Sequence, residues 1–291
     1  MESLFRITEQ MPEMEEEVKE GGIMEDLRLG KKGKDLGLLC KLLGVPAREE
    51  FDRNLDESVK SYQRLKGLVV DGWVGYNTWK SLILDYREKV HSVNSPKIDD
   101  WDYDMFSKLL GIEAAALKAV QEVETGGKGG FLANGKPQIL FEGHVFWKEL
   151  VNLGINPEKY GSAWSNVLYK TWDRTKYKGG TGEWDRLELA KKINERAAYK
   201  SASWGMYQIM GNNYTKCGCK SVEDFARIMS KDSFSQFILG VEFLKNTGMV
   251  KYLKAKDWAS FARVYNGSGY KQNKYDEKLE KAYNKYKTTQ K

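Results

Sequence analysis

The sequence predicts a mainly helical protein of two domains. The chain has 291 residues, which suits two domains at roughly 100–200 residues each. Apolar residues recur at helical spacing through most of the chain, whereas only one short apolar run, at 137–147, is typical of a strand or hairpin. We therefore expect a small three-helix domain, followed by a larger helical domain with at most a small β element.

Composition divides the chain into four segments. Residues 1–26 are acidic and interrupted by glycines, which is typical of a flexible extension. A compact apolar pattern follows at 27–85, and 86–100 is polar, has a Ser-Pro step and lacks an apolar period, as a linker does. The remaining segment, 101–291, forms the larger domain, with helical periods at 104–124, 186–199, 221–229, 232–247 and 256–265.

Charge differs sharply between the N-terminal extension and the rest. Residues 1–26 hold nine acids and two bases, whereas the rest of the chain holds 45 bases and 32 acids, a surplus of 13 positive charges. A basic surface suits a polyanion such as nucleic acid or the bacterial envelope, or it is simply a solvated face. No helix clusters Arg and Lys in a recognition motif, so we do not expect nucleic-acid binding.

The cysteines and the apolar runs exclude several other classes. The cysteines are Cys40, Cys217 and Cys219, and a C-x-C pair with only two histidines in the chain makes a poor disulfide and an incomplete zinc site. We expect reduced cysteines and synthesis in a reducing cytosol. No run of about 18 apolar residues occurs, so we expect no membrane span. The N-terminus is acidic and lacks a basic leader, so we do not expect a conventional signal peptide.

The small domain contains a recognisable motif. Its segments "LRLGKKGKDLGLLCKLLG" and "SVKSYQRLKGLVVDGWVGYNTWKSL" resemble the peptidoglycan-binding domain of cell-wall lytic enzymes, with the D-G-x-x-G-x-x-T-W signature intact from Asp71 to Trp79. The resemblance implies a three-helix fold that binds peptidoglycan. The signature residues expected to form the wall-binding module's site are Asp71, Gly72, Trp73, Thr78 and Trp79.

Glu124 is the first candidate catalytic residue. In "LKAVQEVETGGKGGFL" it shares a helical stripe with Leu117 and Val120, whereas Glu122 follows Lys118 by four residues, as in an exposed ion pair. Apolar neighbours and the negative end of the helix dipole both favour a protonated carboxyl, which is the state of a general acid. Lysozyme illustrates the same effect, because an apolar pocket keeps its catalytic acid protonated. From this segment alone, an ordinary glutamate in a last helical turn remains the alternative.

The larger domain resembles the N-acetylmuramidase domain of modular phage endolysins, within the lysozyme and lytic-transglycosylase superfamily. The motifs, in order, are "AVQEVETGGKGGFLANGKPQILFEGHVFW", "SASWGMYQIMGNNY" and "DWASFARVYNGSGYKQNKYDEKL". The resemblance implies that Glu124 is the catalytic acid. It also implies that the "G-x-x-Q-I" and "Y-N-G" elements bind sugar through Tyr207, Gln208, Tyr265 and Asn266.

Glu142 is the second acid of interest. On an alternating strand it lies on the face opposite Ile139 and Phe141, within an otherwise apolar segment. Three roles are open: a second catalytic carboxylate that orients water, a structural acid bonded to backbone, or a partner of His144. We expect His144 to be structural rather than a metal ligand.

Together the resemblances imply a peptidoglycan-degrading endolysin that cuts the β-1,4 bond between N-acetylmuramic acid and N-acetylglucosamine by general acid catalysis. No metal or organic cofactor is expected. The alternatives are a lytic transglycosylase with 1,6-anhydro products, or a non-catalytic wall-binding virion protein. We expect a monomer that stays in the host cytoplasm before lysis and reaches the wall through a separate holin-type pore.

Overall fold

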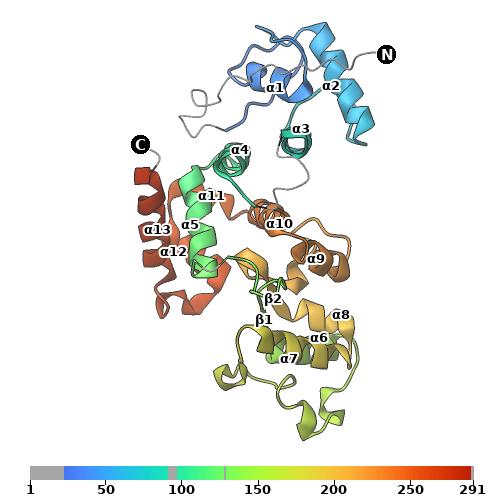
Figure 1. Cartoon of the computed structure of the whole chain (residues 1–291), viewed down its shortest axis with the longest axis vertical. Coiled ribbons are helices and arrows are strands. Elements are labelled where there is room, and N and C mark those ends of the chain that lie inside the picture. The colour runs from blue at the N-terminus through green and yellow to red at the C-terminus, as the bar shows by residue number, and fades with distance from the viewer. Residues whose placement is uncertain (1–22, 91–96, 128, 290–291) are drawn as a thin grey trace, which may run out of the picture.

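The computed structural model describes residues 23–90, 97–127 and 129–289 (Figure 1). Within these ranges the chain forms thirteen α-helices and one three-stranded sheet, which confirms the mainly helical class. No helix in this part of the chain has both the length and the apolar character needed to cross a bilayer. Most of the acidic extension, 1–22, lies outside the described residues.

Three helices form the N-terminal domain: α1 (Leu36–Leu43), α2 (Arg53–Leu65) and α3 (Tyr76–Val90). Leu39, Val59 and Leu82 are fully buried between them, as their helical spacing predicts. An isolated antiparallel β-bridge between Leu27 and Val74 joins the segment before α1 to the loop before α3.

The segment between the domains is short. Residues 86–90 of the expected linker continue α3, residues 91–96 lie outside the described part, and α4 begins at Asp100. The buried guanidinium of Arg87 donates to Asp102 Oδ1 at 2.6 Å, so an ion pair joins the two ends of this segment.

Further polar contacts hold the N-terminal domain against the larger one. Glu242 on the larger domain accepts from Tyr76 Oη at 3.0 Å and from Lys80 Nζ at 2.9 Å. On the other side, Lys108 Nζ lies 2.6 Å from the buried Asp35. The two domains therefore meet through several charged contacts rather than through the connecting segment alone.

The larger domain contains ten helices and the sheet. Its helices are α4 (Asp100–Leu110), α5 (Ala114–Thr125), α6 (Gly143–Asn152), α7 (Thr181–Lys191), α8 (Glu195–Lys200), α9 (Val222–Met229), α10 (Ser233–Asn246), α11 (Val250–Ala255), α12 (Trp258–Asn266) and α13 (Tyr275–Thr289). The helical period at 104–124 is split into two helices because Gly111 takes a left-handed conformation (φ 68°) that ends α4.

The sheet runs through the middle of this domain. It consists of β1 (Ile139–Phe141), β2 (Ala202–Trp204) and β3 (Ile209–Met210), in that order and antiparallel. The apolar run at 137–147 thus forms a strand and then starts α6, as predicted. Helices α5, α12 and α13 lie above the sheet in Figure 1, and α6 and α7 lie below it.

Candidate active site

Glu124 lies in the last turn of α5, one residue before the helix ends. Gly126 (φ 56°) and Gly127 (φ 77°) then take left-handed conformations that side chains would disfavour. A Cβ added at either glycine would have no atom within 4 Å, so the space beside this turn is open. The carboxyl group therefore stands beside a turn that a bulky ligand can approach.

Asn266 reaches Glu124 from the end of α12. Its Nδ2 donates to Glu124 Oε1 at 3.0 Å, although the two residues lie 142 positions apart in the chain. Tyr265 directly precedes Asn266 in the chain, and burial raises the pKa of its hydroxyl. The structure thus brings Glu124, Tyr265 and Asn266 together.

The surroundings of Glu124 favour its protonated form. Burial raises its pKa to about 7, and the hydrogen bond from Asn266 opposes that rise only in part. A carboxyl with a pKa of about 7 is protonated in a large share of molecules at neutral pH and can still give up its proton, which is the requirement for a general acid.

This pKa predicts the pH dependence of the reaction. A general acid must be protonated, so the rate should fall as pH rises through about 7. Asn266→Ala removes a bond that stabilises the carboxylate, so its pKa should rise and the alkaline limb should move to higher pH. Measuring kcat/KM across the range from mildly acidic to mildly alkaline pH for both proteins checks this; an alkaline limb that stays in place or moves to lower pH would contradict it.

Tyr207 and Gln208 have different surroundings from those predicted. Tyr207 is fully buried and its ring packs against Gly240, so it has no face to offer a sugar and contributes to packing instead. Gln208 takes a strained left-handed conformation (φ 43°), and its side-chain amide bonds Gly205 O at 2.8 Å and Ser203 Oγ at 2.9 Å. Its amide therefore holds the turn between β2 and β3.

Tyr265 connects this turn to the acid. Its hydroxyl donates to the Tyr207 carbonyl at 2.5 Å, and its ring stacks on Phe261. Since Asn266 follows directly in the chain, the bond from Tyr265 fixes the end of α12 that presents the Asn266 amide to Glu124.

A buried amide holds the glycine turn in place. Gln236 on α10 is fully buried, accepts from Met206 N at 2.9 Å and donates to Gly130 O at 3.2 Å and Met229 O at 2.8 Å. A Cβ added at Gly130 would lie 1.9 Å from Gln236 Oε1, so the glycine is required by this close approach. Gln236 was not among the residues predicted from the sequence, although a lone amide in the apolar run "SFSQFILGVEFL" was a signal.

Glu142 belongs to a different cluster. It precedes α6, its backbone N–H bonds Ser201 O at 2.8 Å, and its Oε2 accepts from Tyr177 Oη at 2.5 Å and lies 3.3 Å from His144 Nδ1. Burial lowers the pKa of His144. The contacts described for Glu142 are thus with Tyr177, His144 and the Ser201 carbonyl rather than with Glu124, Tyr265 or Asn266.

Glu122 faces away from Glu124, as predicted, but its partner differs. Its Oε2 accepts from Lys285 Nζ and Tyr286 Oη, both at 2.6 Å, and the bond from Lys285 is the main cause of its lowered pKa. Lys118 pairs instead with Asp100 at 2.6 Å. The predicted ion pair between Lys118 and Glu122 is therefore wrong, because Asp100 on α4 pairs with Lys118 and Lys285 on α13 pairs with Glu122.

The signature residues of the N-terminal domain have mostly structural contacts. Asp71 Oδ1 accepts from Trp73 N at 2.8 Å, Thr78 is buried, and the buried Trp79 donates to Glu25 O at 2.9 Å. A Cβ at the left-handed Gly72 (φ 73°) would lie 2.2 Å from Asp56. Trp73 differs, since 46% of its surface is exposed.

No cluster of three metal-ligating side chains occurs within residues 23–90, 97–127 and 129–289. The three cysteines are free thiols, all buried. Burial raises the pKa of Cys219 to about 11, so its thiol keeps its proton at neutral pH.

Comparison with known proteins places the chain in a family. The N-acetylmuramidase family model matches residues 113–287, and a peptidoglycan-binding domain model matches residues 34–82. The crystal structure of the Burkholderia AP3 phage endolysin is similar, with 30% sequence identity and a TM-score of 0.60, over 91% of this chain and 100% of that chain. No curated protein sequence matches at a significant level. The chain therefore belongs to the N-acetylmuramidase family.

Proposed function

We propose that this protein is an endolysin that cleaves the β-1,4 bond between N-acetylmuramic acid and N-acetylglucosamine in peptidoglycan. The observation that carries this proposal is the buried Glu124 carboxyl, whose pKa burial raises to about 7, bonded to Asn266 beside an open glycine turn in a domain of the N-acetylmuramidase family. The similarity to a phage endolysin over most of both chains supports it.

Glu124 acts as the general acid in this proposal. Its proton passes to the glycosidic oxygen as the bond between that oxygen and C1 breaks, and positive charge develops on the sugar ring. Glu124 is then a carboxylate, which stabilises that charge electrostatically. Asn266 keeps one oxygen of Glu124 engaged, so the other is left to face the substrate.

Water then captures the sugar cation. Because the Tyr177 hydroxyl already bonds Glu142, we propose that Glu124 itself takes the proton of the incoming water, which restores the acid for the next cycle. Glu142→Gln should then lower turnover less than tenfold. A loss as large as that caused by Glu124→Gln would restore Glu142 as the second catalytic carboxylate.

A simple assay separates this enzyme from a non-catalytic wall-binding protein. A suspension of purified peptidoglycan should clear when the wild-type protein is added, and soluble fragments should appear in the supernatant. Protein that sediments with the walls without clearing them would favour the binding protein. Because the wall is insoluble, an appended binding domain raises the local concentration of the active site.

The N-terminal domain binds the wall in this proposal, and Trp73 is its best-placed contact. Three exposed apolar side chains precede it in the sequence, at Leu65, Val69 and Val70. Trp73→Ala in the Glu124→Gln background should reduce co-sedimentation with intact walls severalfold. Trp172→Ala, which removes a tryptophan that is 60% exposed in the larger domain, is the control. Equal losses in both variants would contradict a specific role for Trp73.

We further propose that the protein acts as a monomer and needs no cofactor. Before lysis it would stay in the host cytoplasm and reach the wall through a pore formed by another protein. Cells that express the protein without a pore-forming partner should then stay intact, and should lyse once their cytoplasmic membrane is permeabilised.

A further inference from the structure

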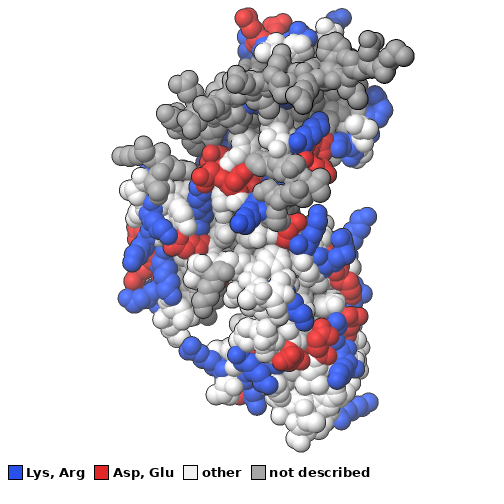
Figure 2. All heavy atoms as spheres, viewed as in Figure 1, with Lys and Arg blue, Asp and Glu red and all other residues white. Residues whose placement is uncertain are grey.

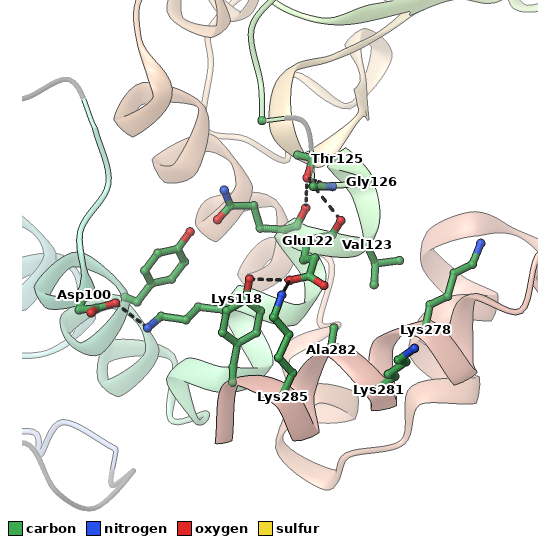
Figure 3. Close-up of a pocket in the computed structure, with 15 residues that line it drawn as sticks. Asp100, Lys118, Glu122, Val123, Thr125, Gly126, Lys278, Lys281, Ala282 and Lys285 are labelled. Carbon is green, nitrogen blue, oxygen red and sulfur yellow. Dashed lines mark hydrogen bonds and ion pairs between the residues drawn. The ribbon is translucent and has the colours of Figure 1, made fainter. Parts of the chain in front are cut away.

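A groove of about 1020 Å³ lies between α5 and α13 (Figure 3). Its floor includes Gly126, Gly127 and Gly129, the glycines of the turn that follows Glu124. Glu124 itself is absent from the lining, whereas Glu122 and Val123 are part of it. The glycine turn is thus the border that the groove shares with the candidate active site.

The groove carries a surplus of positive charge. Its lining contains four lysines and two acids, at positions 118, 278, 281, 285, 100 and 122. Asp100 and Glu122 are each paired with one lysine at 2.6 Å, as the dashed lines in Figure 3 show. Lys278 and Lys281, three residues apart on α13, are exposed and have no ion pair with any described residue. Figure 2 shows basic side chains gathered along this edge of the molecule.

We propose that this groove binds the stem peptide of the peptidoglycan strand being cut, through the carboxylates of that peptide. This inference rests on the proposed function. The muramic acid at the cleaved bond carries a short peptide with free carboxylates, and this peptide must leave the active site near Glu124. A Cβ added at Gly126, Gly127 or Gly129 would meet no atom within 4 Å, so the peptide has open space beside these three glycines, from which it reaches Lys278 and Lys281.

Charge complementarity supports this occupant. Two unpaired ammonium groups suit a ligand with several carboxylates, and the polar Gln121 also lines the groove. Exposed ion pairs are individually weak, at about 0.2–1 kcal/mol. The groove should therefore set substrate affinity rather than the chemical step.

A double variant tests the proposal. Lys278→Glu with Lys281→Glu reverses both charges and leaves Glu124 untouched. The matched control is Lys251→Glu with Lys254→Glu, because these lysines are also exposed, three residues apart, and lie on α11 outside the groove. Kinetics are measured on soluble glycan chains, freed of accessory wall polymers, before and after an amidase removes their peptides.

The double variant at 278 and 281 should raise KM about tenfold on peptide-bearing chains and should match the wild type on bare chains. The control should match the wild type on both. Equal KM values on peptide-bearing chains, equal increases on both substrates, or a loss seen only with accessory anionic polymers present would overturn the proposal. If the wild type cleaves neither substrate, the proposed function fails instead.

Discussion

Glu124→Gln is expected to lower kcat/KM on peptidoglycan by on the order of 10²–10⁴-fold, the usual contribution of general acid catalysis. The glutamine has nearly the same shape and can still bond Asn266, but it has no proton to give to the leaving oxygen. Wall binding should be unchanged, because the N-terminal domain is untouched. Fragment release and co-sedimentation, measured on one protein preparation, check both expectations.

Glu122→Gln is the control for this variant, because it makes the same change two residues away on the outer face of α5. It should retain most activity while losing the charge of its ion pair with Lys285. A dispensable Glu124 with an essential Glu122 would contradict the assignment.

Stability provides a second check that Glu124→Gln is folded. The folded pKa of Glu124 is raised, so the wild type loses stability as pH rises from the ordinary glutamate range to about 7. Glutamine does not titrate and escapes this loss. At a pH above that range, the variant should therefore unfold at the same or a higher temperature than the wild type.

Arg186→Met is expected to lower the free energy of unfolding by about 3–5 kcal/mol, the cost of leaving a buried charge unpaired. Arg186 is fully buried and donates to Glu183 at 2.7 Å and to the Phe141 carbonyl at 2.8 Å. Glu183 in turn accepts from the backbone N–H groups of Phe141, Lys178 and Gly179. Methionine fills similar space but supplies none of these donors.

Lys191→Met on the same helix is the control. Lys191 pairs with Glu188 and with Glu195, each at 3.2 Å, and about half of each glutamate side chain is exposed, so each pair should contribute less than about 1 kcal/mol. Thermal unfolding of both variants, followed by circular dichroism, makes the comparison. Equal unfolding temperatures would show that the buried pair contributes little to stability.

The sequence predicted the elements of the fold better than their contacts. Apolar periods identified the helices of the N-terminal domain and most of those in the larger one, because a buried stripe has the same spacing in every context. They missed α11 and α13, and the period at 186–199 is divided between α7 and α8. The pair of Glu183 and Arg186 shows the limit: three residues apart on a helix, it has the spacing of an exposed surface pair, yet it is fully buried. The pair is buried because β1 and the loop before α7 pack against it in the folded chain.

The candidate site divides in the same way. The stripe on α5 placed Glu124 at the edge of the buried face, and its neighbours explain its raised pKa. No local pattern indicated that Tyr207 would be buried against Gly240. Nor did any pattern indicate that the Gln208 amide would bond the Gly205 carbonyl within its own turn. These roles depend on segments brought together by the tertiary fold, as the contact between Asn266 and Glu124 does.

Mass spectrometry of the fragments released from purified peptidoglycan tests the central claim most directly. Wild-type protein should release fragments that end in reducing N-acetylmuramic acid, which borohydride converts to the alcohol, and Glu124→Gln should release almost none. Reducing N-acetylglucosamine ends would contradict the proposed bond, and predominantly 1,6-anhydro ends, lighter by one water, would contradict hydrolysis.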